Sequence, residues 1–159
     1  MTGILNRVGA RSGIVSDSGT ASAGTKTLSG TIGLDYEEGT WTPNTNSAGN
    51  YTFSINSANY TKIGRMVMIQ AYLAGNGDGD STGLVIHGLP FVSTAGNHYS
   101  VGVVNFAVGN SSLNGKDCTA RIGDNQSSIY FSYNAQVDIQ QSDIDTGHFI
   151  FSVTYFAAS

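Results

Sequence analysis

The acidic side chains are the first residues in this 159-residue sequence whose spacing could support chemistry. Asp143 and Asp145 are two positions apart, so in an extended chain they share a face and could act as the carboxylate pair of a glycosidase. Glu37 and Glu38 are adjacent and point to opposite faces, so they cannot share a substrate. Aspartates in a loop before a strand are usually solvated turn residues. The sequence therefore predicts no catalytic residue, and we do not expect an enzyme.

Histidine and aspartate spacing gives little support for a metal site. His87, His98 and His148 are isolated, without the close pairs that zinc sites use. The run Asn76-Gly-Asp-Gly-Asp80 superficially resembles a calcium loop, but it lacks the further oxygen ligands and the bidentate Glu of an EF-hand. A hairpin turn is the preferred interpretation, with Asp78 and Asp80 as weak cation ligands. We expect no metal and no cofactor.

The composition indicates a rigid β-protein with an uncharged polar surface. Charged residues make up only 11% of the chain against 40% hydrophobic residues, so Asn, Ser, Thr, Gln and Gly must cover the surface. A net charge of −4 argues against nucleic acid as a partner. The first fifteen residues lack the apolar run of a signal peptide, and no segment is apolar enough to cross a membrane. We expect synthesis in a cytoplasm without membrane insertion. Cys118 has no cysteine partner, and an inert buried thiol is expected there.

Residues 1–34 differ in charge and composition from the rest of the chain. They carry a net charge of +2, whereas residues 35–159 carry −6. Apolar and basic residues at the start precede a spacer of Ser, Gly, Thr and Ala that has almost nothing to bury. We expect a tether that docks on another protein, or a strand exchanged between subunits; a disordered terminus is the alternative. The docking residues we expect are Ile4, Leu5, Arg7, Val8, Arg11 and Ile14.

Residues 35–159 alternate between apolar and polar positions, as strands do. Strands are expected within 51–55, 60–64, 66–73, 84–88, 98–108, 118–122, 128–133 and 148–156. Short turns between them predict an all-β, antiparallel β-sandwich or jelly roll without convincing helices. Both faces of residues 66–73 are apolar, which predicts a central strand covered on both sides, with a neighbouring subunit as one candidate for the cover.

The segment Asp35–Pro43 contains the only Trp and both Glu residues of the chain. We expect it to be a hinge between the tether and the β-structure. Gly39 would permit a turn, Trp41 would pack against the core, and Pro43 would end the strand pairing.

Aromatic side chains on β-loops can stack on sugars and hydrogen-bond to them. The residues that suit this role are Tyr72, His98, Tyr99, Tyr130 and Tyr133. Most tyrosines in a sandwich, however, belong to the core or its rim.

Four motifs in residues 35–159 resemble the terminal β-knob of phage fibre proteins. They are Asp35-Tyr-Glu-Glu-Gly-Thr-Trp-Thr-Pro43, Tyr60-Thr-Lys-Ile-Gly-Arg-Met-Val67, Gly88-Leu-Pro-Phe91 and the Phe-x-Phe-x-x-x-Tyr pattern from Phe149 to Tyr155. Gly9-Ala-Arg-Ser-Gly13 is similar, less specifically, to segments that precede such knobs. The resemblance implies a homotrimer on the virion surface.

Three functions follow from that resemblance. Only about 34 residues precede the knob, without a coiled coil or repeated shaft, which favours a capsid-decorating protein or short head fibre docked on the major capsid protein. The alternative is a small tail-fibre tip that recognises a host surface polysaccharide. A depolymerase is the least favoured, and it would rely on Asp143 or Asp145.

Overall fold

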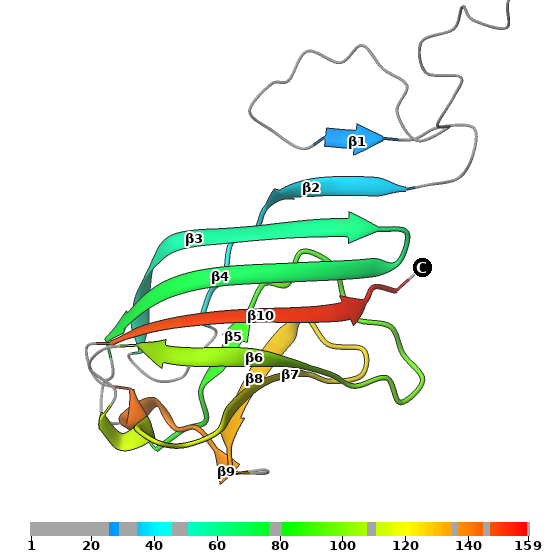
Figure 1. Ribbon diagram of the computed structural model, residues 1–159. Coiled ribbons are helices and arrows are strands. Elements are labelled where there is room, and N and C mark those ends of the chain that lie inside the picture. The colour runs from blue at the N-terminus through cyan, green and yellow to red at the C-terminus, as the bar shows by residue number, and fades with distance from the viewer. Residues whose placement is uncertain are drawn as a thin grey trace, which may run out of the picture.

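The structure, a computed structural model, describes seven segments of the chain. They are residues 26–28, 35–45, 51–76, 81–107, 111–134, 137–144 and 147–158. The described residues form ten strands and two short 3-10 helices (Figure 1). The strands are β1 Lys26–Leu28, β2 Tyr36–Thr40, β3 Thr52–Ile63, β4 Met66–Asn76, β5 Val85–His87, β6 Ser100–Ala107, β7 Cys118–Ile122, β8 Ser128–Tyr133, β9 Val137–Asp138 and β10 His148–Phe156. The helices are η1 Ser111–Leu113 and η2 Gln141–Asp143.

All ten strands belong to one antiparallel sheet, which confirms the predicted all-β class. Nine strands follow the order β1-β2-β3-β4-β10-β6-β7-β8-β5, and β9 pairs with β8. The long strands β3, β4, β10 and β6 lie side by side, and the sheet then curls so that β7, β8 and β5 cross beneath them (Figure 1). The C-terminal strand β10 is therefore central, between β4 and β6. The described part of the chain contains no helix long and apolar enough to cross a membrane.

Strand β3 unites two segments that the sequence separates. Residues 51–55 and 60–64 read as two strands because Asn56 and Ser57 interrupt the alternation, but the structure joins them with a register shift between Ile55 and Ser57. A β-bulge of this kind absorbs one extra residue without ending the pairing. The tight turn to β4 passes through Gly64, whose φ of 58° suits glycine.

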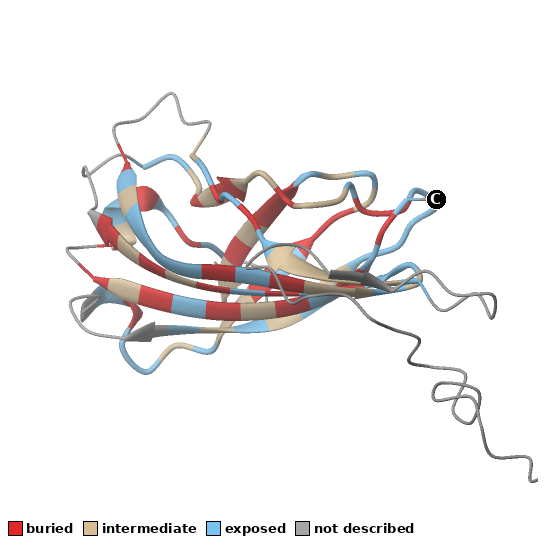
Figure 2. Ribbon diagram, turned by 90° about the horizontal axis from the view of Figure 1, so that it is seen from above, coloured by how far each residue is buried: buried red, intermediate tan, exposed pale blue. Residues whose placement is uncertain are grey.

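The core lies on the concave, inner side of the curled sheet. Buried and exposed residues alternate along the long strands (Figure 2), because successive side chains of a strand point to opposite faces. Phe131 of β8 packs edge-on against Phe149 and Phe151 of β10, with ring centroids 5.9 and 5.3 Å apart. These contacts join the two halves of the curled sheet.

The segment after β2 closes the sheet and is not a simple hinge. Trp41 is 6% exposed, packs edge-on against Phe151, and donates its indole N–H to the carbonyl of Gln70 at 3.4 Å. This confirms the predicted packing of Trp41. The pairing of β2 with β3 ends at Thr40, before Pro43, and Asn44 then forms an antiparallel bridge with a different strand, at His87 of β5.

Gly39 does not provide the predicted turn. It lies within β2 opposite Tyr60, and a Cβ on Gly39 would be 3.0 Å from the Tyr60 ring. Glycine at this position lets the Tyr60 ring lie against the backbone of β2.

Candidate functional site

The convex side of the central strands carries exposed apolar residues where a soluble sheet normally carries polar ones. We call the outward-pointing side chains of β3, β4, β10 and β6 the outer face. Its apolar members are unusually open: Val103 is 74% exposed, Val101 65% and Phe156 54%. The other exposed apolar residues of the outer face are Ile63, Met66, Met68 and Ile150. Several exposed apolar residues gathered on one face of a sheet often mark an interaction site.

The strand register places these residues opposite one another on neighbouring strands. Phe156 of β10 is opposite Met66 of β4, which is opposite Ile63 of β3. Two residues along β10, Thr154 is opposite Met68. The two methionines thus lie in the middle of the four-stranded surface. The predicted central position of residues 66–73 in the sheet is confirmed, and the cover expected over their outer side stays a prediction.

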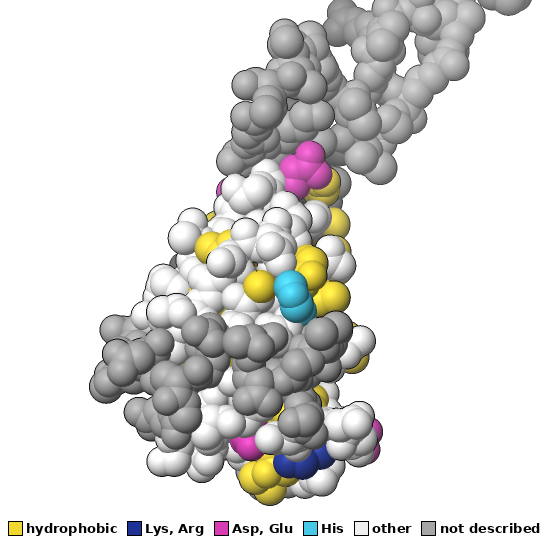
Figure 3. All heavy atoms as spheres, turned by 90° about the vertical axis from the view of Figure 1, so that its left-hand side faces the viewer, with side chains coloured by type: hydrophobic (Ala, Val, Ile, Leu, Met, Phe, Trp, Pro, Cys, Tyr) yellow, Lys and Arg dark blue, Asp and Glu magenta, His cyan; other side chains and the backbone are white. Residues whose placement is uncertain are grey.

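The outer face contains no Asp, Glu, Lys or Arg. From Ser57 to Ile63, Met66 to Tyr72, Ile150 to Phe156 and Val101 to Asn105, every outward side chain is apolar, hydroxyl or amide. Seen from the end where β10 begins, most side chains of the described residues are hydrophobic or uncharged polar (Figure 3). Absence of charge lowers the desolvation cost when another surface covers this one.

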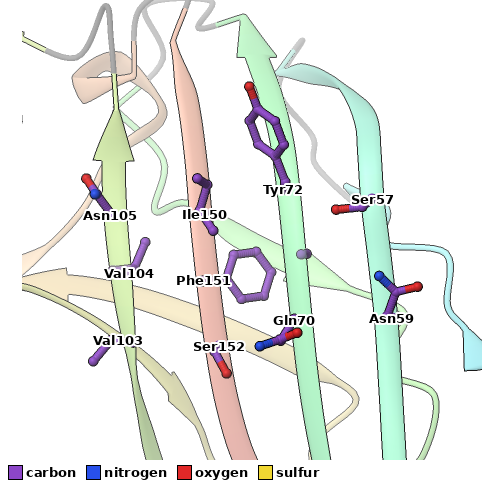
Figure 4. Close-up of a pocket in the computed structure, with 11 residues that line it drawn as sticks. Ser57, Asn59, Gln70, Tyr72, Val103, Val104, Asn105, Ile150, Phe151 and Ser152 are labelled. Atoms are coloured by element: carbon purple, nitrogen blue, oxygen red, sulfur yellow. The ribbon is translucent and has the colours of Figure 1, made fainter. Parts of the chain in front are cut away.

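A groove of 380 Å³ crosses the half of the outer face nearest the start of β10 (Figure 4). Gln70 and Ser152 lie side by side in it because their strands pair at those residues, and Asn59 is opposite Gln70 on the other side. None of these three side chains hydrogen-bonds to another described residue. The remaining lining residues are Ser57, Ala71, Tyr72, Val103, Val104, Asn105, Ile150 and Phe151. The groove therefore offers free amides and hydroxyls beside apolar side chains.

Of the five residues predicted to contact a glycan, Tyr72 alone lines this groove. Its hydroxyl lies 2.9 Å from Nδ1 of His148, and the two rings are 5.4 Å apart, so the tyrosine is held at the groove's end. The structure does not gather the other four around it. His98 and Tyr99 lie on the exposed segment before β6, and Tyr130 and Tyr133 lie on β8, where Lys116 covers the Tyr133 ring.

The acidic pairs considered for catalysis have other partners. Glu37 accepts a hydrogen bond from the Tyr60 hydroxyl, and Glu38 accepts one from Tyr36 at 2.7 Å. Because Tyr60 is buried in the core and Tyr36 is not, the two carboxylates face opposite sides of the sheet, as predicted. Asp143 accepts the backbone N–H of Gln140 at 2.9 Å and caps η2. Asp145 lies outside the described residues.

A serine–histidine contact also occurs, in a place that substrate cannot reach. The Ser128 hydroxyl lies 2.8 Å from Nδ1 of His87, and the two residues are directly opposite on β8 and β5. Ser128 is only 5% exposed. The pair therefore links two strands and has no access to a substrate.

The other sequence-based expectations fall partly outside the described residues. The docking residues Ile4, Leu5, Arg7, Val8, Arg11 and Ile14 and the cation candidates Asp78 and Asp80 all lie there. Among the described residues, no group of three or more His, Cys, Asp or Glu could hold a metal ion. Cys118 is only partly buried, and this burial raises the pKa of its thiol, which favours the protonated form.

The exposure of the apolar residues of β6 and β10 was not expected from the sequence. Val101, Val103 and Ile150 are apolar like core residues. Only the register of β6 against β10, and of β10 against β4, shows that they share the outer face with Met66 and Met68. The sequence indicates such residues where one strand has apolar side chains at both its odd and its even positions, and therefore on both faces of the sheet.

Comparison with known proteins returns no match, whether to a protein-family model, a curated protein or a solved structure.

Proposed function

We propose that this protein is a non-enzymatic structural component of a phage particle surface, a trimeric capsid-decorating protein or short head fibre. In this proposal the curled sheet is the jelly-roll or sandwich-like knob, and the N-terminal arm docks on the major capsid protein or another virion protein. The protein reaches the virion surface after synthesis in the host cytoplasm.

The observation that carries this proposal is the uncharged, apolar outer face. Exposed Val101, Val103 and Phe156 on a well-hydrogen-bonded sheet are costly for an isolated subunit, and they favour a protein that works in an assembly. The phage assignment itself rests on the sequence resemblance of residues 35–159 to fibre knobs.

The location of the protein on intact particles tests the proposal. Particles labelled with antibody-coupled gold against this chain should carry label on the head. Deletion of residues 2–15 should abolish incorporation while leaving a folded, assembled knob. Label confined to the tail would favour the alternative below, and normal incorporation of the deletion variant would contradict docking by the arm.

The alternative is a tail-fibre tip that recognises a host surface glycan, and the groove favours it. Free amides at Asn59 and Gln70 beside the Tyr72 ring suit the hydroxyl groups of an uncharged sugar. Purified protein applied to host cells and to a glycan array tests this function. Binding that Tyr72→Ala removes would support it, and absence of binding at high protein concentration would count against it.

A further inference from the structure

A row of side chains crosses the groove of the outer face at Gln70 (Figure 4). The strand register places Gln70 of β4 opposite Asn59 of β3 on one side and opposite Ser152 of β10 on the other. Ser152 is in turn opposite Val103 of β6. The row therefore passes from two amides to a hydroxyl and ends on an exposed apolar side chain.

A second row lies two residues along the strands, nearer the start of β10 (Figure 4). Tyr72 of β4 is opposite Ser57 of β3 and Ile150 of β10, and Ile150 is opposite Asn105 of β6. Neighbouring strands are about 4.8 Å apart, and two residues along a strand span about 6.6 Å. The short Ser152 side chain lies among bulkier neighbours of both rows, so the surface is hollowed there.

The polar side chains of the first row keep their hydrogen-bonding capacity. Asn59, Gln70 and Ser152 form no side-chain hydrogen bond with another described residue. A side-chain amide offers both N–H donors and a carbonyl acceptor, and a hydroxyl offers one donor and two lone pairs. A ligand amide needs both kinds of partner, an acceptor for its N–H and a donor for its carbonyl. No charged side chain lines the groove, so it complements an uncharged ligand.

The apolar side chains beside these polar groups distinguish an acetamido group from a hydroxyl group. Ile150 is 46% exposed and Val103 74%, and both are next to Ser152. A sugar hydroxyl at this place would leave them facing a polar group, whereas the methyl of an acetamido group would remove apolar surface from water. Tyr72 adds a ring on which a sugar can stack, and its hydroxyl lies 2.9 Å from Nδ1 of His148, which holds the ring in place.

We propose that the groove binds an N-acetylated amino sugar and selects it by the acetamido group. Gln70 accepts a hydrogen bond from the acetamido N–H, and Ser152 donates one to its carbonyl. The methyl contacts Ile150 and Val103. The volume of 380 Å³ is near the lower end of the range of roughly 300–1,000 Å³ for small-molecule sites, which suits one or two sugar units. This inference rests on the alternative function above, from which it takes a sugar as the ligand.

The first experiment compares two sugars that differ in the acetamido group. Chitotriose and cellotriose have the same β-linked backbone, but each unit of chitotriose carries an acetamido group where cellotriose carries a hydroxyl. Each is titrated into the isotope-labelled whole chain, and the amide resonances are followed by NMR. Chitotriose should shift the resonances of Gln70 and Ile150, and cellotriose should bind at least about tenfold more weakly. Equal affinities, or no shift with chitotriose at about 10 mM, would overturn the proposal.

The second experiment tests the residues that would select the acetamido group. Ile150→Thr keeps a β-branched side chain but replaces an apolar contact, so the preference for chitotriose over cellotriose should fall about threefold or more. Val101→Thr is the matched control, because Val101 is also exposed on the outer face but does not line the groove. Gln70→Ala should weaken chitotriose binding at least about tenfold. Circular dichroism checks that all three variants fold. Wild-type binding by Gln70→Ala, or an equal loss of preference in Ile150→Thr and Val101→Thr, would refute the assignment.

Failure of this inference and failure of the proposed functions give different results. Equal binding of chitotriose and cellotriose would keep the groove as a sugar site, and with it the alternative function, but would reject selection by the acetamido group. Absence of sugar binding together with gold label on the particle head would keep the decoration function and overturn the inference. A self-associated protein in which a second copy covers Gln70 and Ile150, so that chitotriose shifts no resonance, would also overturn it.

Discussion

Asn44 and His87 exchange backbone hydrogen bonds of 3.0 and 2.8 Å and thereby join the start of the sheet to its far edge. Asn44 follows β2, near one end of the strand order, and His87 belongs to β5, at the other end. The bridge ties the segment after β2 to the edge strand and leaves that edge less open to pairing with another chain. Residues 41–45 therefore act as a strap across the curled sheet.

Gly88→Ala should loosen this strap. Gly88 has a φ of 87°, and a Cβ there would lie 2.6 Å from the carbonyl oxygen of Thr42 and 2.8 Å from Nδ2 of Asn44. Backbone strain together with the clash should lower the free energy of unfolding by about 2–3 kcal/mol, as measured by urea denaturation.

Two other glycines separate the causes of that loss. Gly64→Ala places alanine at the positive φ of 58° that Gly64 already has, with no atom within 4 Å of the new Cβ, so it should cost only about 1 kcal/mol. Gly83→Ala meets neither a positive φ nor a neighbour and should be close to neutral. If Gly88→Ala and Gly64→Ala lowered the free energy of unfolding equally, the contact of the new Cβ with Thr42 and Asn44 would add nothing to the cost of the positive φ.

Trp41→Ala should destabilise the fold by about 3–5 kcal/mol, because it removes a buried aromatic side chain that packs on Phe151. Thermal unfolding followed by circular dichroism measures the change. A variant that keeps its melting temperature but loses binding to host cells or particles would instead identify Trp41 as a contact residue.

The sequence predicted the all-β class, most strands and the buried position of Trp41, because alternation and apolar content are local properties. It could not predict the strap, since Asn44 and His87 are 43 positions apart and meet only through the curl of the sheet. The outer face could not be predicted from the sequence either. Val103 resembles a core residue until its partner Ser152 on β10 shows which way it points.

Removal of the hydroxyl should change the free energy of unfolding differently at the two most buried tyrosines. Tyr155 donates to the carbonyl of Phe91 at 2.8 Å, whereas the Tyr51 hydroxyl is buried without a hydrogen-bond partner among the described residues. Tyr155→Phe should cost about 1 kcal/mol, and Tyr51→Phe should be neutral or stabilising, because a buried unsatisfied polar group is itself unfavourable. Urea denaturation of both variants at pH 7 checks this. A larger loss for Tyr51→Phe than for Tyr155→Phe would mean that the Tyr51 hydroxyl has a stabilising partner.

The same tyrosines should make the protein sensitive to alkali. Burial raises the pKa of both Tyr51 and Tyr155 above the ordinary value of 10.0, and for Tyr155 the hydrogen bond from its hydroxyl to Phe91 only partly offsets this. Since the folded state holds these protons more tightly than the unfolded state, the stabilisation is complete below about pH 10 and is lost progressively above it. Urea midpoints measured between pH 8 and about pH 11.5 should fall above pH 10, and less steeply for the double variant Tyr51→Phe/Tyr155→Phe. Parallel curves for wild type and double variant would show that these hydroxyls do not control the alkaline transition.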